Sequence, residues 1–460
     1  ELIGLHLHLG ETDRAFNALE QAKSQVLINY LSNREQFRWS RERPESLALI
    51  DELERLRAEH QVFYHLAFDP PGEQDVSRAT IPQVAFSEVT SRERRMRAIT
   101  ERLYLLSHSD NAAASSYSAL LPKIQASIDQ STLLVEFYDD GLHFWAFVLD
   151  GQSCEVQPLP VKVETFGRLL LQLQSNIMAA LRVEPGSQAV RRLTLLAERL
   201  LQRLYAILLE PLGIQRRGRE RLIIVPYGAL HYLPFHLLHD GASYLIENYE
   251  VVTLPAASLV TRSSPRRSPG ALIISHSRAG RLPHTLTEAQ IVQSLFGGDL
   301  RVEEAATRAV LQTKPTQILH IATHAQHRLD QPDLSFLELA DGQLYADDLL
   351  QQDLSYELVT LSACETGRAQ VAADEELIGI GRGLLYAGAG ALLLSMWQVA
   401  DSSTVALMDK LYRALRQGKS KAASLREAQK FFLAESPELH PAFWGAFQLI
   451  GDAGPLSTIH

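Results

Sequence analysis

The sequence predicts a mainly parallel α/β fold preceded by a helical segment. Through the second half of the chain, short apolar segments alternate with helical ones, which indicates parallel strands covered by helices on both faces. From about residue 131 the apolar period changes to two, which predicts antiparallel strands. Residues 1 to about 110 are rich in charge and carry apolar residues at helical spacing.

Composition narrows the class of protein. The 460 residues correspond to roughly three domains, and 46% hydrophobic with 21% charged residues is the composition of a globular chain, which excludes a disordered or collagen-like one. The excess of acidic over basic residues, 54 against 44, disfavours direct binding to nucleic acid. The two cysteines, Cys154 and Cys364, suit a reducing compartment, so we expect a cytoplasmic protein.

Two segments bear on targeting and on membrane insertion. The N-terminal ELIGLHLHLG has neither the basic region nor the cleavage site of a signal peptide. Residues 383–400 carry no charge and are just long enough for a spanning helix, but Gly388 and Gly390 would end a helix there. We therefore expect a buried helix, a turn and a strand at 383–400, and no membrane span.

The first 110 residues are predicted to be helical. Ala15, Leu19 and Ala22 recur at helical spacing, and residues 45–66 repeat the pattern. Residues 11–27 look like the last helices of a tetratricopeptide array. Because no full repeat of roughly 34 residues is present, a plain helical hairpin is an equally good interpretation.

The rest of the chain divides at a polar, Pro-rich link at residues 261–270. Before it, the pattern predicts three strands at 132–159 with turns at 139–141 and 150–151, helices at 164–182 and 188–211, and a strand at 221–228. After it, the pattern predicts strands at 271–276, 317–324, 357–364 and 391–399, and helices at 286–297, 375–390, 402–418 and 420–434.

Two reactive side chains end predicted parallel strands. His324 closes the strand at 317–324, and Cys364 closes the strand at 357–364, which is 364 − 324 = 40 residues further on. Reactive groups gather beyond the carboxyl ends of such strands, so imidazole and thiol would meet at one edge. A thiolate nucleophile needs a neighbouring base or cation, and the imidazole can then protonate a leaving amine. A lone cysteine is otherwise most often a buried structural residue, so its place at a strand end is what favours catalysis.

Other chemistries find less support. His320 lies on the same face as His324 and either orients the site or is a hydrogen-bonded core histidine. Two histidines in one strand and two distant cysteines do not form a metal site, so we expect no metal. The glycine-rich run at 379–390 follows no strand and indicates close helix packing with a glycine cap. The chain lacks G-x-x-x-x-G-K-[ST] and G-x-S-x-G, so we expect no cofactor and no Ser-His-Asp hydrolase.

The segments around these residues resemble the CHAT domain family, which comprises caspase-like cysteine peptidases related to separase and often fused to tetratricopeptide repeats. The similarity includes LHIATHAQ around His324, LVTLSACETGRA around Cys364 and the run from EELIGIG to AASLREAQ. Upstream it includes LIIVPYGALHYLPFHLLHDG and YLIENYEVVTLPAASL, so it covers about residues 130–460.

The resemblance implies a caspase-like sandwich, a mainly parallel sheet flanked by helices, in three parts. These are a helical segment at 1–115, which would be the end of a tetratricopeptide array, a degenerate caspase-like half at 116–265 and a catalytic half at 266–460. His324 would be the catalytic histidine and Cys364 the nucleophile of a cysteine endopeptidase.

The resemblance also assigns the oxyanion hole to the backbone N–H groups of Cys364 and Ala325. The family usually has glycine where this chain has Ala325. Alanine keeps the N–H but would be strained if the site requires a positive φ there.

Substrate contacts follow from the same resemblance. In caspase-like folds the substrate pairs with the strand that follows the nucleophile's helix, which here is LLLSMWQVAD. Candidate contacts are Ser395, Trp397 and Asp401. Asp374, Glu375 and Glu376 follow the nucleophile loop; they either face a basic residue of the substrate or complement the dipole at a helix N-terminus.

The sequence therefore predicts a cysteine endopeptidase that cleaves a protein or peptide substrate. The family implies regulation by a partner or signal in a bacterial stress or defence pathway, with the N-terminal helices docking an activating protein. The alternative is a catalytically inactive scaffold that binds proteins. The replacement of the family's usual glycine by Ala325 is the feature that favours this alternative. A small-molecule amidohydrolase is a third interpretation.

Overall fold

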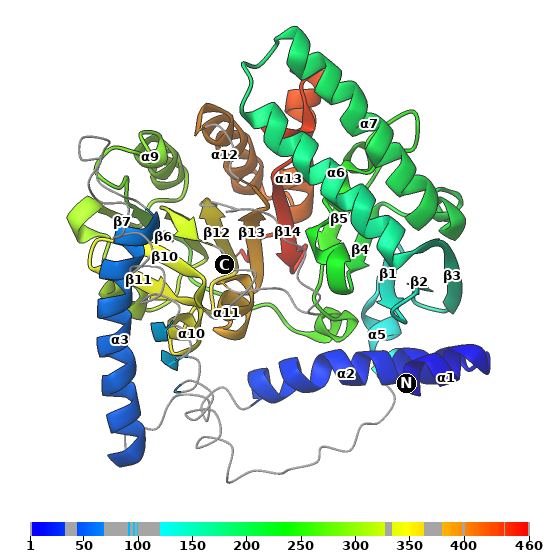
Figure 1. Cartoon of the computed structure of the whole chain (residues 1–460), viewed down its shortest axis with the longest axis horizontal. Coiled ribbons are helices and arrows are strands. Elements are labelled where there is room, and N and C mark those ends of the chain that lie inside the picture. The colour runs from blue at the N-terminus through cyan, green and yellow to red at the C-terminus, as the bar shows by residue number, and fades with distance from the viewer. Residues whose placement is uncertain are drawn as a thin grey trace. The chain divides into compact units, whose positions relative to one another are not determined.

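The computed structural model describes residues 2–32, 44–68, 91–92, 95–96, 99, 120–326, 334–362, 380–397, 401–436 and 438–458. The chain divides into two compact units, residues 1–29 with 117–460 and residues 30–116. The first unit is built on an eleven-stranded sheet with helices on both faces (Figure 1), which confirms the predicted α/β class. Among the described residues, no helix combines the length and apolarity that crossing a membrane requires.

The large sheet contains two blocks of parallel strands that run in opposite directions, and its remaining two strands pair antiparallel at one edge. The first block is β1, β4, β5 and β14, and the second is β13, β12, β8, β6 and β7. The blocks meet where β14 lies antiparallel to β13. In spatial order the strands are β3 (Cys154–Lys162), β2 (His143–Leu149), β1 (Thr132–Asp139), β4 (Arg221–Val225), β5 (Glu250–Thr253), β14 (Phe447–Gly451), β13 (Ala391–Ser395), β12 (Leu358–Ser362), β8 (Ile318–Ala322), β6 (Ala271–Ser275) and β7 (Asp299–Val302).

A smaller antiparallel sheet follows β8 directly. It comprises β11 (Gly342–Tyr345), β10 (Phe336–Leu339) and β9 (Ala325–Gln326) in that order. The helices are α1 (Leu2–His8), α2 (Thr12–Ser32), α3 (Pro44–Phe68), α5 (Leu120–Ser127), α6 (Val163–Leu181), α7 (Gln188–Leu208), α8 (Leu245–Asn248), α9 (Thr285–Phe296), α10 (Ala346–Leu350), α11 (Ile380–Tyr386), α12 (Asp401–Arg416) and α13 (Lys421–Glu435). Short 3-10 helices are η1 (Glu210–Leu212), η2 (Ile214–Arg217), η3 (Gly228–Tyr232), η4 (Phe235–Leu237), η5 (Ala257–Thr261), η6 (Glu303–Ala305), η7 (Arg308–Gln312) and η9 (Pro441–Phe443).

Alternate residues of the second block enter separate cores on opposite faces of the sheet. On one face, Leu319 of β8 packs in a cluster with Leu384 of α11. On the other face, the adjacent Ile318 belongs to a larger cluster with Met408 of α12. Figure 1 shows α9, α12 and α13 on one side of the sheet and α10 and α11 on the other. Burial on both faces explains why these strands are continuously apolar in sequence.

Local signals in the sequence explain several of the turns and helix ends. Asp140 and Asp150 each accept hydrogen bonds from two backbone N–H groups in the predicted hairpin turns. Gly388, with φ +110°, follows the end of α11. At Gly383 a Cβ would lie 2.7 Å from the Ala346 carbonyl oxygen. The glycine-rich run is therefore close helix packing with a glycine at the helix end, as predicted.

The second unit contains α3 and part of the segment at 91–99. Arg92 pairs with Glu59 at 3.2 Å, and Arg95 pairs with Glu52 at 2.8 Å. Leu53 of α3 is buried. Apolar spacing in the sequence identified this helix correctly.

A buried polar cluster fastens α2 to the first block of strands. Lys23 Nζ donates to Glu136 Oε1 at 2.9 Å and to the Pro226 carbonyl at 3.2 Å. The carboxylate of Glu20 accepts from the backbone N–H groups of Ala257 and Ser258, at the start of η5. Glu20 and Glu136 are both fully buried. Burial raises the pKa of Glu136 well above its ordinary value, and the nearby charge of Glu20 raises it further, against the lowering effect of Lys23.

The raised pKa of Glu136 makes stability depend on pH. Above the unfolded-state pKa of about 4.3, unfolding releases the proton that the folded carboxyl retains. The free energy of unfolding therefore falls as pH rises toward the folded pKa, with a slope approaching about 1.4 kcal/mol per pH unit. Glu136→Gln should remove this slope when urea unfolding is measured from pH 5 to pH 8.

The matched control is Glu155→Gln, which changes a carboxylate of β3 whose side chain is 61% exposed. It should keep the slope of the wild type. A slope that is the same in Glu136→Gln and wild type would show that Glu136 is not the titrating group.

Candidate active site

His324 lies at the carboxyl edge of the second block of strands. The strand predicted at 317–324 is shorter in the structure, so His324 follows the end of β8 and directly precedes β9. Its carbonyl accepts a hydrogen bond from Glu338 N of β10 at 2.8 Å, and Thr323 Oγ1 donates to the Glu338 carbonyl. The His324 side chain is 9% exposed. The small sheet, absent from the sequence-based prediction, thus fixes the backbone at this histidine.

The strand that leads to Cys364 is the neighbour of the strand that leads to His324. β12 runs parallel to β8, with Ser362 opposite Ala322. Cys364 is the second residue after Ser362 and lies outside the described residues, as do Asp374, Glu375 and Glu376. Both strand ends therefore reach the same edge of the sheet, as expected for neighbouring parallel strands.

Ala325 begins β9 opposite Leu337 of β10. Among the described residues, the non-glycine residues with a positive φ are Arg278, Ala279 and Glu303. Ala325 is therefore in ordinary extended backbone, and the strain that an alanine would suffer in the left-handed region does not arise.

A strained loop after β6 lies beside this edge and was missed by the sequence analysis. Arg278 and Ala279 have φ values of 52° and 55°, a conformation that costs on the order of 1–3 kcal/mol per residue. Arg278 Nε donates to Glu338 Oε1 at 3.1 Å, and Ser277 N donates to Glu303 Oε1 at 3.1 Å. Glu338 thus joins the ends of β6 and β8. The strand-end rule that selected His324 would also have selected this loop, had it been applied to the strand at 271–276.

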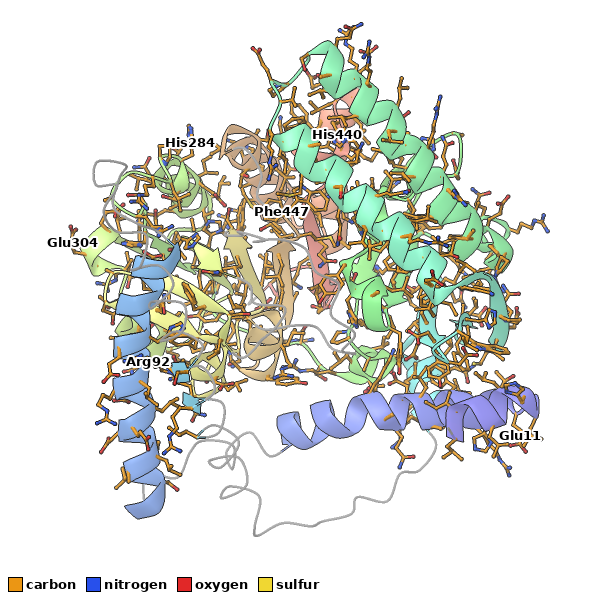
Figure 2. The ribbon with its side chains drawn as sticks, in the orientation of Figure 1. Glu11, Arg92, His284, Glu304, His440 and Phe447 are labelled. Atoms are coloured by element: carbon orange, nitrogen blue, oxygen red, sulfur yellow. The ribbon has the colours of Figure 1, made fainter. Side chains whose placement is uncertain are left out.

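The candidate substrate contacts occupy different environments. β13 ends at Ser395, earlier than predicted, and Ser395 pairs with Phe447 of β14, which is labelled in Figure 2. Because residues 392–394 are paired with β12 on one side and with β14 on the other, these three residues have no free strand edge for a substrate. Asp401 begins α12, and its side chain lies outside the described residues.

Trp397 is a buried residue of the larger hydrophobic core. It is 5% exposed, and its Nε1 donates to the Ala442 carbonyl at 2.9 Å. The Ala442 N–H in turn donates to His440 Nδ1, and His440 Nε2 lies 2.8 Å from Asn176 Oδ1 of α6. Burial lowers the pKa of His440 to about 4, so this histidine is neutral near pH 7. The chain of contacts holds Trp397 in place.

His320 is a hydrogen-bonded core histidine beneath this edge. It is fully buried, its Nδ1 lies 2.9 Å from the hydroxyl of Tyr412, and its Nε2 lies 3.1 Å from Glu288 Oε1. Glu288 also accepts a hydrogen bond from Ser362 Oγ at 2.9 Å. His320 is therefore a hydrogen-bonded core histidine, one of the two interpretations that the sequence left open, and its contacts reach the strand that leads to Cys364.

The second cysteine, Cys154, has none of the features of an activated thiol. It begins β3, at the far end of the sheet from β8 and β12. Burial raises the pKa of the Cys154 thiol to about 12. Its thiol is therefore protonated near pH 7.

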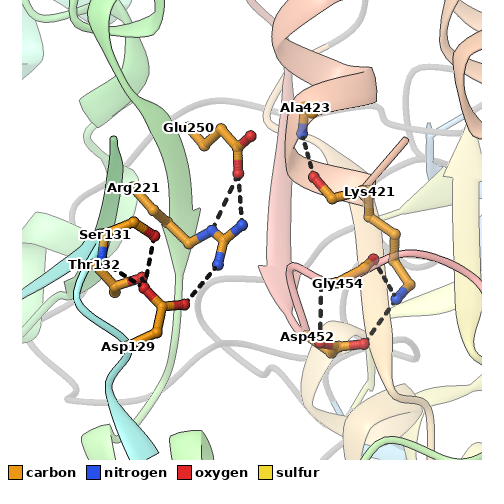
Figure 3. Close-up of polar contacts among 10 residues, drawn as sticks. Asp129, Ser131, Thr132, Arg221, Glu250, Lys421, Ala423, Asp452 and Gly454 are labelled. Carbon is orange, nitrogen blue, oxygen red and sulfur yellow. Dashed lines mark hydrogen bonds and ion pairs between the residues drawn. The ribbon is translucent and has the colours of Figure 1, made fainter. Parts of the chain in front are cut away.

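A cleft of about 220 Å³ lies at the seam between the two blocks, and its described lining includes neither cysteine nor histidine. Three charged side chains of its lining form ion pairs (Figure 3): Arg221 binds Glu250 at 2.8 Å and Asp129 at 3.4 Å, and Asp452 binds Lys421 at 2.7 Å. A fourth, Arg262, donates to the backbone carbonyls of Gly388 and Ala389. Burial acts to raise the pKa of Asp452, but Lys421 lowers it below its ordinary value overall. In the described part of the chain, no group of three or more His, Cys, Asp or Glu residues is arranged to hold a metal ion.

The region that contains His324 and Cys364 is similar to a known domain family. The model of the CHAT domain matches residues 198–452. Tetratricopeptide repeat protein 28 of Mus musculus and that of Homo sapiens are each 28% identical over 342 residues, covering 59% of this chain. This chain spans 14% of the length of these relatives.

Two solved structures of the Saccharomyces cerevisiae separase–securin complex share the fold. Their TM-scores are 0.50 and 0.51, with 10% and 9% sequence identity. The similarity covers 97% of this chain and 41% and 42% of those chains. The large, mostly parallel sheet flanked by helices thus matches a separase-like, caspase-like fold, as the sequence resemblance implied.

Proposed function

Because the chain belongs to the CHAT domain family, we propose that it is a cysteine endopeptidase that cleaves a protein substrate with a dyad of His324 and Cys364. The observation that carries the proposal is the parallel pairing of β8 with β12, in which Ala322 lies opposite Ser362. Each of these two residues is two positions before a member of the dyad. An imidazole and a thiol that follow adjacent strand ends have the chemistry that acyl transfer to sulfur requires.

The proposed reaction proceeds through a thioester. The thiolate of Cys364 attacks the carbonyl carbon of the scissile peptide bond, and the backbone N–H groups of Cys364 and Ala325 bind the oxyanion. The C–N bond breaks as His324 gives a proton to the departing amine. His324 then takes a proton from water, whose oxygen attacks the thioester and releases the carboxylic acid and the thiolate.

The proposal extends to the substrate and to regulation. Ser395, Trp397, Asp401 and the acidic run at 374–376 are proposed to contact the substrate. The division into a helical segment (1–115), a degenerate half (116–265) and a catalytic half (266–460) belongs to the same proposal.

Regulation through the N-terminal helices has a structural argument in its favour. α2 extends from Thr12 to Ser32, so it crosses the boundary between the two units at residue 29. Lys23 of α2 binds Glu136 of β1, and Glu20 of α2 binds the backbone at the start of η5. A partner that binds the first part of α2 would therefore contact a helix that is joined to the first unit. The proposal also includes activation within a bacterial stress or defence pathway, and this part rests on the family resemblance alone.

The test is cleavage of a proteome-derived peptide library by the full chain, read as new N-termini by mass spectrometry. The wild type should produce a consistent set of new N-termini. His324→Ala should reduce their rate of appearance on the order of 10²–10⁴-fold, the usual contribution of general acid–base catalysis.

His143→Ala, which changes an exposed histidine of β2, is the matched control and should cleave like the wild type. Equal cleavage by wild type and His324→Ala would contradict the proposal. Absence of cleavage by every form would favour a protein-binding scaffold, although the lack of strain at Ala325 removes the observation that spoke for it.

A further inference from the structure

Four elements bring polar side chains together in the core directly beneath the ends of β8 and β12. Glu288 of α9 is 3% exposed, and His320 of β8, Thr360 of β12 and Tyr412 of α12 are each fully buried. His320 and Thr360 lie opposite each other in the parallel pairing. Ser362, the last residue of β12, donates to Glu288 Oε2 at 2.9 Å.

The contacts in this cluster link β8 to β12. The Tyr412 hydroxyl donates to Thr360 Oγ1 at 2.7 Å and lies 2.9 Å from His320 Nδ1. On the other side of the ring, His320 Nε2 lies 3.1 Å from Glu288 Oε1.

Two side chains of the cluster contact both strands. Tyr412 does so through His320 and Thr360, and Glu288 does so through His320 and Ser362, the last residue of β12. Through Oε1 Glu288 contacts His320, four residues before His324, and through Oε2 it binds Ser362, two residues before Cys364. It also stands on a separate element, α9, which packs against β6 and β8. An apolar side chain would fill this core without the cost of desolvating a carboxylate and an imidazole.

We propose that Glu288 is a positioning residue of the peptidase site, which sets the relative placement of the β8 and β12 ends and thereby the distance between His324 and Cys364. This inference rests on the proposed endopeptidase function and deepens it. A displacement of about 1 Å at reacting groups costs on the order of 10²-fold in rate, so a buried contact of this kind can control the reaction without touching the substrate.

The test measures covalent labelling of Cys364 by a peptidyl acyloxymethyl ketone in the full chain. The thiolate attacks the methylene carbon, a thioether forms, and the acyloxy group leaves as a carboxylate. Labelling kinetics separate the maximal rate constant from the half-saturating probe concentration. Glu288→Leu should lower the maximal rate on the order of 10²-fold and leave half-saturation unchanged, because the probe's binding surface is intact.

Two further variants separate positioning from general loss of stability. Glu288→Gln can still accept from Ser362 through its oxygen and donate to His320 through its amide, so it should restore most of the maximal rate. Ser362→Ala removes the contact to β12 alone and should lower the maximal rate by itself. Glu136→Leu, a matched loss of a fully buried carboxylate from the first block, should lower stability but not the maximal rate of the folded fraction.

The outcomes distinguish this inference from the function on which it rests. If the wild type labels at Cys364 while Glu288→Leu and Ser362→Ala label at its rate, the positioning role is wrong and the peptidase function stands. If Glu288→Leu and Glu136→Leu lower the maximal rate equally, the effect is one of stability and the positioning role is again wrong. If the folded wild type does not label, the proposed function fails, and this inference fails with it.

Discussion

Replacing Cys364 by alanine is expected to abolish peptide hydrolysis by the folded chain. Without the thiol no thioester can form, and removal of the nucleophile from a comparable peptidase triad lowers kcat on the order of 10⁶-fold. The measurement is kcat on a peptide that the wild type cleaves, with circular dichroism to show that the variant is folded. Because Cys364 follows β12 at the edge of the sheet, we expect the substitution to leave the two cores intact.

The chain supplies its own matched control for this experiment. Cys154→Ala changes the other cysteine, whose pKa burial raises to about 12 and which lies in β3 at the far end of the sheet. It should change kcat by less than about twofold, because a thiol that stays protonated is no nucleophile. Hydrolysis that survives in Cys364→Ala and disappears in Cys154→Ala would reverse the assignment of the two cysteines.

Replacing Lys23 by methionine is expected to cause the largest loss of stability. The substitution leaves the fully buried carboxyl of Glu136 without the cation that it contacts at 2.9 Å. Breaking a buried ion pair from one side costs about 3–5 kcal/mol, so urea unfolding at pH 8 should show a decrease of that size. The decrease should be smaller at pH 5 than at pH 8, because the pKa of Glu136 is raised by burial, the protonated fraction grows as pH falls, and a protonated carboxyl needs no cation.

Two variants test the reason for this loss. Lys23→Met combined with Glu136→Gln removes both members of the pair and should recover much of the lost stability. Lys162→Met, which changes an exposed lysine at the end of β3, should alter stability by less than about 0.5 kcal/mol. A loss in Lys23→Met that is equal at both pH values and is not recovered in the double variant would mean that packing of the lysine chain, not charge, fastens α2.

Sequence periodicity predicted those elements whose folding is decided locally. β1 and β2 are short apolar runs and β3 alternates more polar and less polar residues, and the three strands are separated by turns in which Asp140 and Asp150 bind the backbone. α6 and α7 have one apolar face each, and β6, β8, β12 and β13 are short apolar runs. In each case the apolar pattern and the turn residues of the segment itself are enough to predict the element.

Elements that depend on distant partners could not be predicted in the same way. β9 has two residues and exists through its pairing with β10, and β7 is short and half exposed. The link at 261–270 has the composition of a loop, but Arg262 donates to the carbonyls of Gly388 and Ala389, and Arg267 donates to Ser355. The position of β14 between β5 and β13 is likewise set by contacts far apart in the sequence.

The candidate site likewise contains one residue that the local sequence predicts and one that depends on distant contacts. His324 was selected because it ends a predicted strand, and the structure places it two residues after one. Glu288 was not selected, because in sequence it is an ordinary polar residue of a helix. Its burial against His320 and Ser362 depends on the packing of α9 against β6 and β8, which no local pattern contains.

The most direct test of the central claim is the intact mass of the full chain after incubation with a panel of peptidyl acyloxymethyl ketones that differ in their terminal residue. The account predicts a single adduct, mapped by peptide sequencing to Cys364, absent from Cys364→Ala and strongly slowed in His324→Ala, with the reactive probe identifying the preferred residue at the cut. Equal and slow labelling of Cys154 and Cys364, unaffected by His324→Ala, would contradict it.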